Sequence, residues 1–438
     1  MRLGRIPLIV WIICASFLVR LIFAGFVWER VGLEGFETTR VHSDAAQYIE
    51  LTKSILKDKT FTLYGISHSF RTPGYPLWLA FWYGFSGSWF FAVGVVGSAL
   101  GALSVYGIYK IGLELLSPRY ALYAAVLFAF EPYGVHMASR PMTESLYAFL
   151  IVGMAWLFLH TTKTMGNRSI FFTALTGLVV GFSILVRPQM WPFFVVISPL
   201  IVTLALLRTH GWKIAVGSAF VLSIVAALTV SPWIIRNKAM FGVADVSSQG
   251  GWNLYFYFAK RFTGADRYYG LTEDEVKRDL DRRLGEASTY DIRSIAYQPL
   301  YYKDAFDIIL AHPVQFGLWH IKEGLVYFYD DGLRDMLRHI DVESEGPLFR
   351  SSSGVILGVA VLGMRLVWCA LFIFFGVAVY RDFFNRQRGA VTIFFAFLVL
   401  YVPVVAGTLA VARFRFALTP LLFLLAVRGY TLLRKLTV

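Results

Sequence analysis

The chain has 438 residues, of which 57% are hydrophobic and only 16% are charged. A soluble globular protein carries about 25% charged residues, so this composition argues against a water-soluble enzyme and against a disordered protein. The net charge of +13 would suggest a nucleic-acid partner in a soluble protein. In a membrane protein, positive residues instead report orientation, and we expect no nucleic-acid partner.

Ten apolar stretches approach the roughly 20 residues that span a bilayer as a helix. In chain order they are 6–28, 88–110, 120–138, 144–162, 169–186, 190–207, 213–235, 355–380, 389–409 and 416–433. Two further apolar stretches are less clear. Residues 74–85 are too few to span a bilayer, and the stretch 308–329 is interrupted by polar residues. The sequence therefore predicts an all-α polytopic membrane protein with about ten transmembrane helices, or 11–13 if these stretches cross. Otherwise they form interfacial helices at the outer face.

Lysine and arginine residues orient these helices, because they gather in cytoplasmic connections. With Arg2 and Arg5 inside, every short inner connection carries positive charge, and so does the C-terminal end at Arg434 and Lys435. Both termini are then cytoplasmic, and 29–87 and 236–354 are outside. We divide the chain into a catalytic membrane module (1–235, including 29–87), an extracytoplasmic loop region (236–354) and C-terminal helices (355–438).

Acidic and basic residues gather at the predicted outer ends of many different helices. Ionisable residues at membrane depth are costly and are a functional hypothesis by default. The outer set comprises His42, Asp44, Arg71, Glu131, Arg140, Glu144, Arg187, Arg236, Arg413 and Arg415. Arg413 and Arg415 stand out, because the positive-inside trend disfavours arginines there, and an anionic partner such as a lipid phosphate would explain them.

Simpler roles compete with function at several of these positions. Asp44 and Gln47 are spaced as a helix capping box, and Glu144 suits the start of a helix. Arg236 would then only reach toward the interface. Glu131 is harder to explain by capping, so its simpler role is an ion pair with a nearby arginine.

The order of the motifs resembles the GT-C superfamily of integral-membrane glycosyltransferases. The motifs are HSDAAQY (42–48), RTPGYPL (71–77), Thr143-Glu144, LVRP (185–188), PWIIRN (232–237) and RFRFALTP (413–420). The nearest branch by resemblance is the bacterial one akin to protein O-mannosyltransferases and the lipid A aminoarabinose transferase. That branch implies a bacterial inner-membrane protein, a sugar donor linked to polyprenyl phosphate, and an active site on the periplasmic side.

The resemblance also implies roles for two acids. Asp44 matches the acid that acts as base or orients the acceptor, and Glu144 matches a position that is usually Asp in relatives. Members of the superfamily differ in metal dependence, so a divalent metal stays an open alternative here.

These groups suit transfer of a sugar to a hydroxyl. Asp44 would accept the proton of the acceptor, a lipid, glycan or protein, while Arg71, Arg236, Arg413 and Arg415 are candidates to bind the donor phosphate. A single displacement would invert the anomeric centre. Two alternatives stay open: a polysaccharide ligase or polymerase, and a lipid-linked sugar transporter (flippase). The sequence does not identify the sugar or the acceptor.

Overall fold

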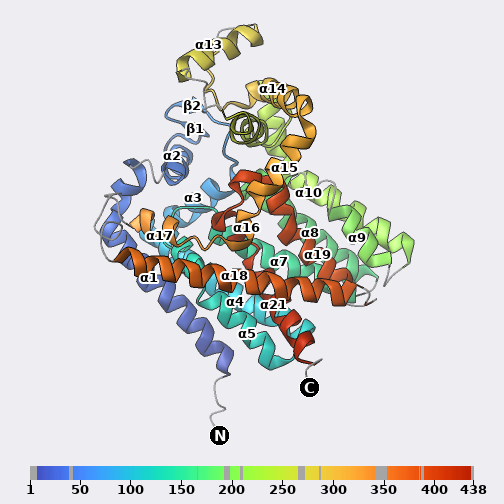
Figure 1. Ribbon diagram of the computed structural model, residues 1–438. Coiled ribbons are helices and arrows are strands. Elements are labelled where there is room, and N and C mark those ends of the chain that lie inside the picture. Colours follow the sequence, from blue (N-terminus) through green and yellow to red (C-terminus); the bar gives the residue numbers. More distant parts are fainter. Residues whose placement is uncertain are drawn as a thin grey trace.

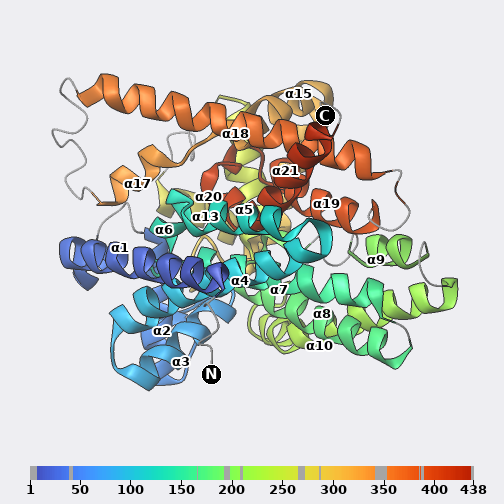
Figure 2. The same ribbon diagram turned by 90° about the horizontal axis from the view of Figure 1, so that it is seen from below.

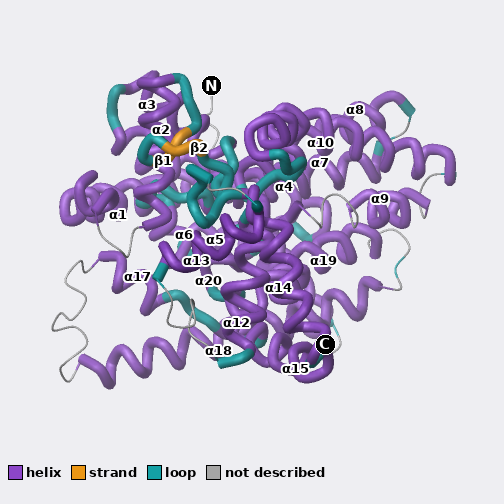
Figure 3. Tube along the Cα trace, turned by 90° about the horizontal axis from the view of Figure 1, so that it is seen from above, coloured by secondary structure: helices purple, strands orange, loops and turns teal. Residues whose placement is uncertain are grey.

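A computed structural model describes residues 7–38, 43–164, 166–191, 198–207, 211–264, 272–285, 288–340, 353–383, 385 and 389–435. Figures 1 and 3 show that helices dominate these residues. The strands described there form one short antiparallel hairpin, β1 (Thr62–Leu63) with β2 (Ile66–Ser67). In its register Thr62 pairs with Ser67.

Seven helices of the described chain are long and apolar enough to cross a membrane. They are α1 (Leu8–Thr38), α4 (Val96–Leu115) with the π-helical turn Phe91–Val95 before it, α7 (Glu144–Lys163), α8 (Asn167–Val186), α10 (Trp212–Phe241), α18 (Ser353–Phe383) and α19 (Gly389–Ala406). Each matches one of the ten predicted stretches. The all-α polytopic membrane class is therefore confirmed.

The other three predicted spans form shorter helices in the described residues. Residues 120–138 form α5 (Pro118–Ala129) and α6 (Pro132–Met137), because Pro132 starts a new helix after Glu131. The remaining two stretches contain α9 (Ser198–Leu207) and α21 (Thr419–Arg434). Residues 192–197, which precede α9, lie outside the described residues.

The two ambiguous apolar stretches form short helices rather than continuous spans. The first is α3 (Gly74–Ser86), of 13 residues. The second falls within three consecutive helices, α14 (Gln298–Ala311), α15 (Pro313–Gly324) and α16 (Val326–Tyr329). Pro313 begins α15, so a single spanning helix does not form there.

Helix α4 lies at the centre of the bundle, where it contacts α1, α5, α7 and α21. In Figure 2, α7, α8 and α10 pack together on one side, and α18, α19 and α21 form a second group. The α18–α21 contact is close: a Cβ on Gly429 would stand 1.8 Å from the Phe374 carbonyl oxygen. Only glycine therefore fits at this crossing.

The start of α1 and the end of α21 lie at one end of the bundle in Figure 1. Ion pairing of Lys163 with Glu114 joins the end of α7 to α4, and Arg434 near the end of α21 donates to the Tyr120 hydroxyl at 3.0 Å. These residues belong to the connections that the charge pattern places inside. Sidedness relative to a membrane stays a prediction.

The opposite end carries the short helices of the two long predicted outer segments. The first segment contains α2 (Ser43–Asp58), the hairpin and α3. The second contains α11 (Gln249–Trp252), the π-helical turn Asn253–Ala259, α12 (Lys260–Phe262), α13 (Glu273–Leu284), the 3₁₀ turn Ile295–Tyr297, α14–α16 and α17 (Leu333–Ile340). The 3₁₀ turn Gly407–Leu409 and α20 (Ala412–Phe416) then lead into α21. The predicted module boundaries at 235 and 354 fall inside α10 and α18, and the three-part division stays a prediction.

Candidate functional site

A cavity of about 560 Å³ lies among the ends of several helices and the second long segment. Its lining comes from α2, the 70–71 turn, the residues after α8, residues 245–258, residues 293–302, the end of α19 and α20. One wall is apolar and contains Val402, Val405, Ala406, Leu409 and Phe258. Polar and charged side chains from regions far apart in the sequence line other parts of it.

Arg71 reaches this cavity because its turn packs tightly against the end of α8. A Cβ on Gly74 would stand 2.7 Å from the backbone of Leu185, so glycine permits the approach of α3 to α8. The backbone N–H of Arg71 donates to Nε2 of His68 at 3.0 Å, and Arg236 Nη1 donates to the His68 carbonyl at 2.8 Å. These bonds hold the turn that positions Arg71.

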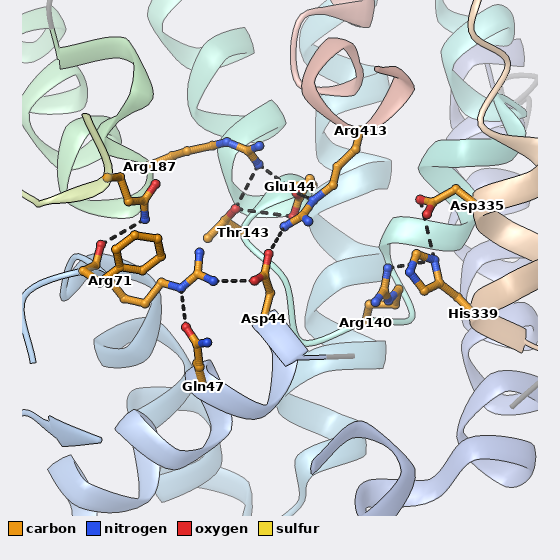
Figure 4. A network of polar contacts seen from close by, with 12 residues as sticks. Asp44, Gln47, Arg71, Arg140, Thr143, Glu144, Arg187, Asp335, His339 and Arg413 are labelled. Carbon is orange, nitrogen blue, oxygen red and sulfur yellow. Dashed lines mark hydrogen bonds and ion pairs between the residues drawn. The ribbon is translucent and has the colours of Figure 1, made fainter. Parts of the chain in front are cut away.

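Asp44 lies between two arginines in Figure 4. Arg71 Nη2 donates to one carboxylate oxygen, and Arg413 Nη2 donates to the other at 2.8 Å. Arg71 Nε also donates to Gln47 Oε1 at 2.8 Å. The Gln47 oxygen, which a capping box would direct at the backbone, is therefore engaged by Arg71.

Glu144 is the second carboxylate of the group, and it is fully buried. Its Oε1 accepts from Arg187 Nη1 and from Arg413 Nε, each at 2.7 Å. Arg187 also donates to the Thr143 hydroxyl at 3.2 Å, and its guanidinium lies 4.7 Å from the centre of the Phe414 ring. We call Asp44, Arg71, Glu144, Arg187 and Arg413 the carboxylate–arginine cluster.

This cluster holds three guanidinium groups against two carboxylates. Burial alone would raise the pKa of the Asp44 carboxyl, but Arg71 and Arg413 outweigh it and hold that pKa well below its usual range. Burial and the nearby charges of Arg71, Arg293 and Arg236 lower the pKa of His68 to about 3. At neutral pH Asp44 is thus ionised, His68 is neutral, and the cluster has one excess positive charge.

Two of the predicted phosphate ligands make other contacts. Arg415 is buried, donates to the backbone carbonyls of Tyr327 and Asp330, and lies 3.7 Å from the Trp368 ring centre. Arg236 contacts the Trp233 ring at 4.6 Å and bonds the His68 carbonyl. Neither belongs to the described lining of the cavity. Both instead bond to backbone carbonyls.

The remaining candidates also have defined places. Glu131 caps α6 by accepting from the N–H groups of Tyr133 and Gly134, so capping explains a residue for which we expected an ion pair. Arg140 Nη1 is 2.9 Å from His339 Nδ1, in a side-chain group that includes Asp335 (Figure 4). His42 lies outside the described residues.

Sequence reasoning missed several polar residues of the cavity. Asp245, Arg293, Gln298 and Tyr302 line it, and all four come from the second long segment. Their spacing forms no motif, so only the fold brings them together. In the described part of the chain, no group of three His, Cys, Asp or Glu side chains is placed to hold a metal ion.

Comparison with known proteins gives similarity at the level of structure only. No protein family model and no curated protein matches the chain. Among solved structures, it is similar to the archaeal oligosaccharyltransferase AglB from Archaeoglobus fulgidus in complex with an inhibitory peptide and a dolichol-phosphate. That match has 14% identity and a TM-score of 0.49, covering 96% of this chain and 50% of the archaeal one.

The Archaeoglobus fulgidus oligosaccharyltransferase tethered with an acceptor peptide containing the NVT sequon also matches, with 15% identity and a TM-score of 0.47. The covered shares are again 96% of this chain and 50% of that chain. The chain thus spans about half the length of these archaeal proteins. The bacterial branch that the motifs resemble stays a prediction.

Proposed function

We propose that this chain is a membrane glycosyltransferase that moves a sugar from a polyprenyl-phosphate donor to an acceptor hydroxyl at the extracytoplasmic face. The acceptor is a lipid, a glycan or a protein. The observation that carries this proposal is the carboxylate–arginine cluster, which faces a cavity that also has an apolar wall. A lipid-linked anion requires both kinds of surface.

The donor phosphate would bind to the guanidinium groups that face the cavity. Arginine offers paired N–H donors that match phosphate oxygens, and it keeps its charge at every relevant pH. Arg71, Arg187 and Arg413 all line the cavity. As the glycosidic bond breaks, negative charge grows on the leaving phosphate, and prearranged donors stabilise that charge.

Asp44 would act as general base for the acceptor hydroxyl. Its side chain is 29% exposed, whereas that of Glu144 is fully buried, so Asp44 is the accessible carboxylate of the cluster. Both oxygens of Asp44 bond to Arg71 and Arg413 here. If those arginines turned toward a donor phosphate, Asp44 would lose part of its stabilisation as an anion and become a stronger base.

The rest of the cavity fits the same reaction. The wall formed by the end of α19 would hold the first apolar carbons of the donor lipid. Attack by the acceptor on the side opposite the leaving phosphate gives inversion at the anomeric carbon. Glu144 would position Arg187 and Arg413 rather than contact the substrate, because both arginines bond to its buried carboxylate.

Sugar transfer by purified Asp44→Asn protein tests the proposal. We expect transfer from a polyprenyl-phosphate-linked donor to fall by about 10²- to 10⁴-fold, the usual contribution of general base catalysis. Asp274→Asn is the matched control, because Asp274 is exposed on α13. Equal transfer by Asp44→Asn and wild type would refute the role of Asp44 as general base. Transport of a lipid-linked sugar with no transfer by wild type would favour a flippase.

A further inference from the structure

The part of the cavity formed by the second long segment differs from the carboxylate–arginine cluster, because polar groups there have unused hydrogen-bonding capacity. We call Asp245, Arg293, Gln298 and Tyr302 the outer pocket. All four line the same cavity as Asp44 and Arg71. The proposed reaction, as described so far, uses none of them.

The backbone of Arg293 is held by hydrogen bonds to its carbonyl and its N–H. Its carbonyl accepts from the Ser248 hydroxyl, and its N–H donates to Asp291 Oδ1 at 2.6 Å. Two residues later, the Ile295 N–H donates to the Ser69 hydroxyl at 2.9 Å. The chain around Arg293 is thereby tied to the turn that carries Arg71.

In the described chain, the Arg293 guanidinium lies against two aromatic rings. It lies 5.6 Å from the centre of the Phe70 ring and 5.5 Å from that of Trp252. Neither ring offers an oxygen acceptor, and no side-chain hydrogen bond or ion pair of Arg293 exists within the described chain. Its five N–H donors are therefore available to an anion without breaking an ion pair of the protein.

Gln298 also has an unused hydrogen-bonding atom, which in this case is an acceptor. Its Nε2 donates to Asp245 Oδ2 at 2.9 Å, which fixes the orientation of the amide, because a carboxylate only accepts. The opposite atom, Oε1, is buried and has no hydrogen-bond partner in the described residues. The residue is 2% exposed, so leaving this oxygen unpaired carries a desolvation cost, and a ligand hydroxyl that displaced the atoms packed over it would remove that cost.

We propose that the outer pocket binds an anionic saccharide, with a sugar hydroxyl on Gln298 and a carboxylate or phosphate substituent of the sugar on Arg293. This assignment rests on the proposed function and narrows its substrate class to acidic sugars. A neutral sugar would satisfy Gln298 but leave Arg293 without an ion-pair partner among the described residues, because the pocket's carboxylate, Asp245, bonds instead to Gln298 and to the Val246 N–H. A bare lipid phosphate would satisfy Arg293 but offer no hydroxyl to Gln298.

Matched small glycosides test this assignment in the purified full-length protein. Methyl glucuronide and methyl glucoside differ only in carrying a carboxylate or a hydroxymethyl group, and methyl glucoside 6-phosphate tests the phosphate form. We expect wild type to bind one of the two acidic glycosides about 10- to 100-fold more tightly than the glucoside. Preference for the carboxylate or for the phosphate then identifies the substituent.

Substitutions assign that preference to residues. Arg293→Gln should abolish it, and Arg293→Lys should retain part of it, because lysine keeps the charge but loses the paired donors. The matched control Arg282→Gln changes the same charge on an arginine side chain that is 78% exposed, and it should keep the full preference. Gln298→Leu should weaken the binding of acidic and neutral glycosides alike. Melting temperatures identify variants that fail to fold, and Arg293→Lys then carries the test.

Binding of a lipid phosphate without a sugar separates this proposal from the donor site. Arg293→Gln should leave the affinity for sugar-free polyprenyl phosphate unchanged; a loss there would make Arg293 a lipid-phosphate ligand and overturn the saccharide assignment. No preference for either acidic glycoside in wild type would also overturn it. An Arg293-dependent preference in a protein that transfers no sugar would uphold the pocket while refuting the proposed reaction.

Discussion

Two buried groups of arginines and carboxylates lie in different parts of this molecule, and they differ in charge balance. Arg428 on α21 makes two bonds to Asp382 on α18, at 3.1 and 2.9 Å, and Thr392 adds a third to the same carboxylate. One positive charge meets one negative charge there. The carboxylate–arginine cluster has three arginines for two carboxylates, and it faces a cavity.

The comparison teaches that ion pairing alone does not mark a functional site. The Arg428–Asp382 pair is buried between two helices that pack closely, and its side chains are 11% and 6% exposed. The cluster keeps an excess positive charge beside open volume, and this favours an additional anion. The balanced pair is therefore a reference for the unbalanced cluster.

The largest expected effect comes from removing one carboxylate from each group. Glu144→Gln leaves Arg187 and Arg413 without their shared buried partner, and Asp382→Asn does the same to Arg428. Breaking a buried pair by removing one member costs about 3–5 kcal/mol, so both variants should melt at lower temperature. Only Glu144→Gln should also impair sugar transfer, measured below the melting transition. Equal transfer losses in the two folded variants would contradict the distinction.

A smaller effect should separate Arg413 from Arg415, which lie two residues apart on α20. Arg413 bonds to two carboxylates of the cluster, whereas Arg415 bonds to backbone carbonyls. Arg413→Gln should weaken donor binding by about 10- to 100-fold. Arg415→Gln should instead lower stability by about 1–3 kcal/mol with donor affinity retained. Donor titration and thermal melting of both variants measure this, and the reverse pattern would reassign the phosphate ligand.

The smallest effect concerns the pH dependence of stability through His68. Its pKa is lowered to about 3 in the folded protein, against about 6.5 in an unfolded chain. The unfolded state therefore binds a proton between these values while the folded state does not, so stability falls as pH drops below 6.5. His68→Gln should remove a slope of about 1 kcal/mol per pH unit between pH 6 and 4. Melting curves across this range check it, and an unchanged slope would mean that His68 is protonated when folded.

Much of the architecture follows from the sequence, because span length and charge bias are local properties. Seven predicted spans match long helices. Helix ends were harder to predict. We expected an ion pair for Glu131, but its side chain caps α6 by accepting from the N–H groups of Tyr133 and Gly134. Pairing was not predictable: Asp44 meets an arginine 369 residues away. Arg293 gave no signal, because the absence of an ion-pair partner for it among the described residues is visible only once the fold is known.

We propose that the excess positive charge of the cluster binds a lipid phosphate, and a matched pair of lipids tests this. The measurement is the affinity of the purified protein for a sugar-free polyprenyl phosphate and for the neutral polyprenol of equal length. Wild type should prefer the phosphate by about tenfold or more, as expected for charge-assisted hydrogen bonds. Arg71→Gln combined with Arg413→Gln should lose this preference, and Arg428→Gln should keep it. Equal affinity of wild type for the two lipids, or a preference that survives without Arg71 and Arg413, would contradict the claim.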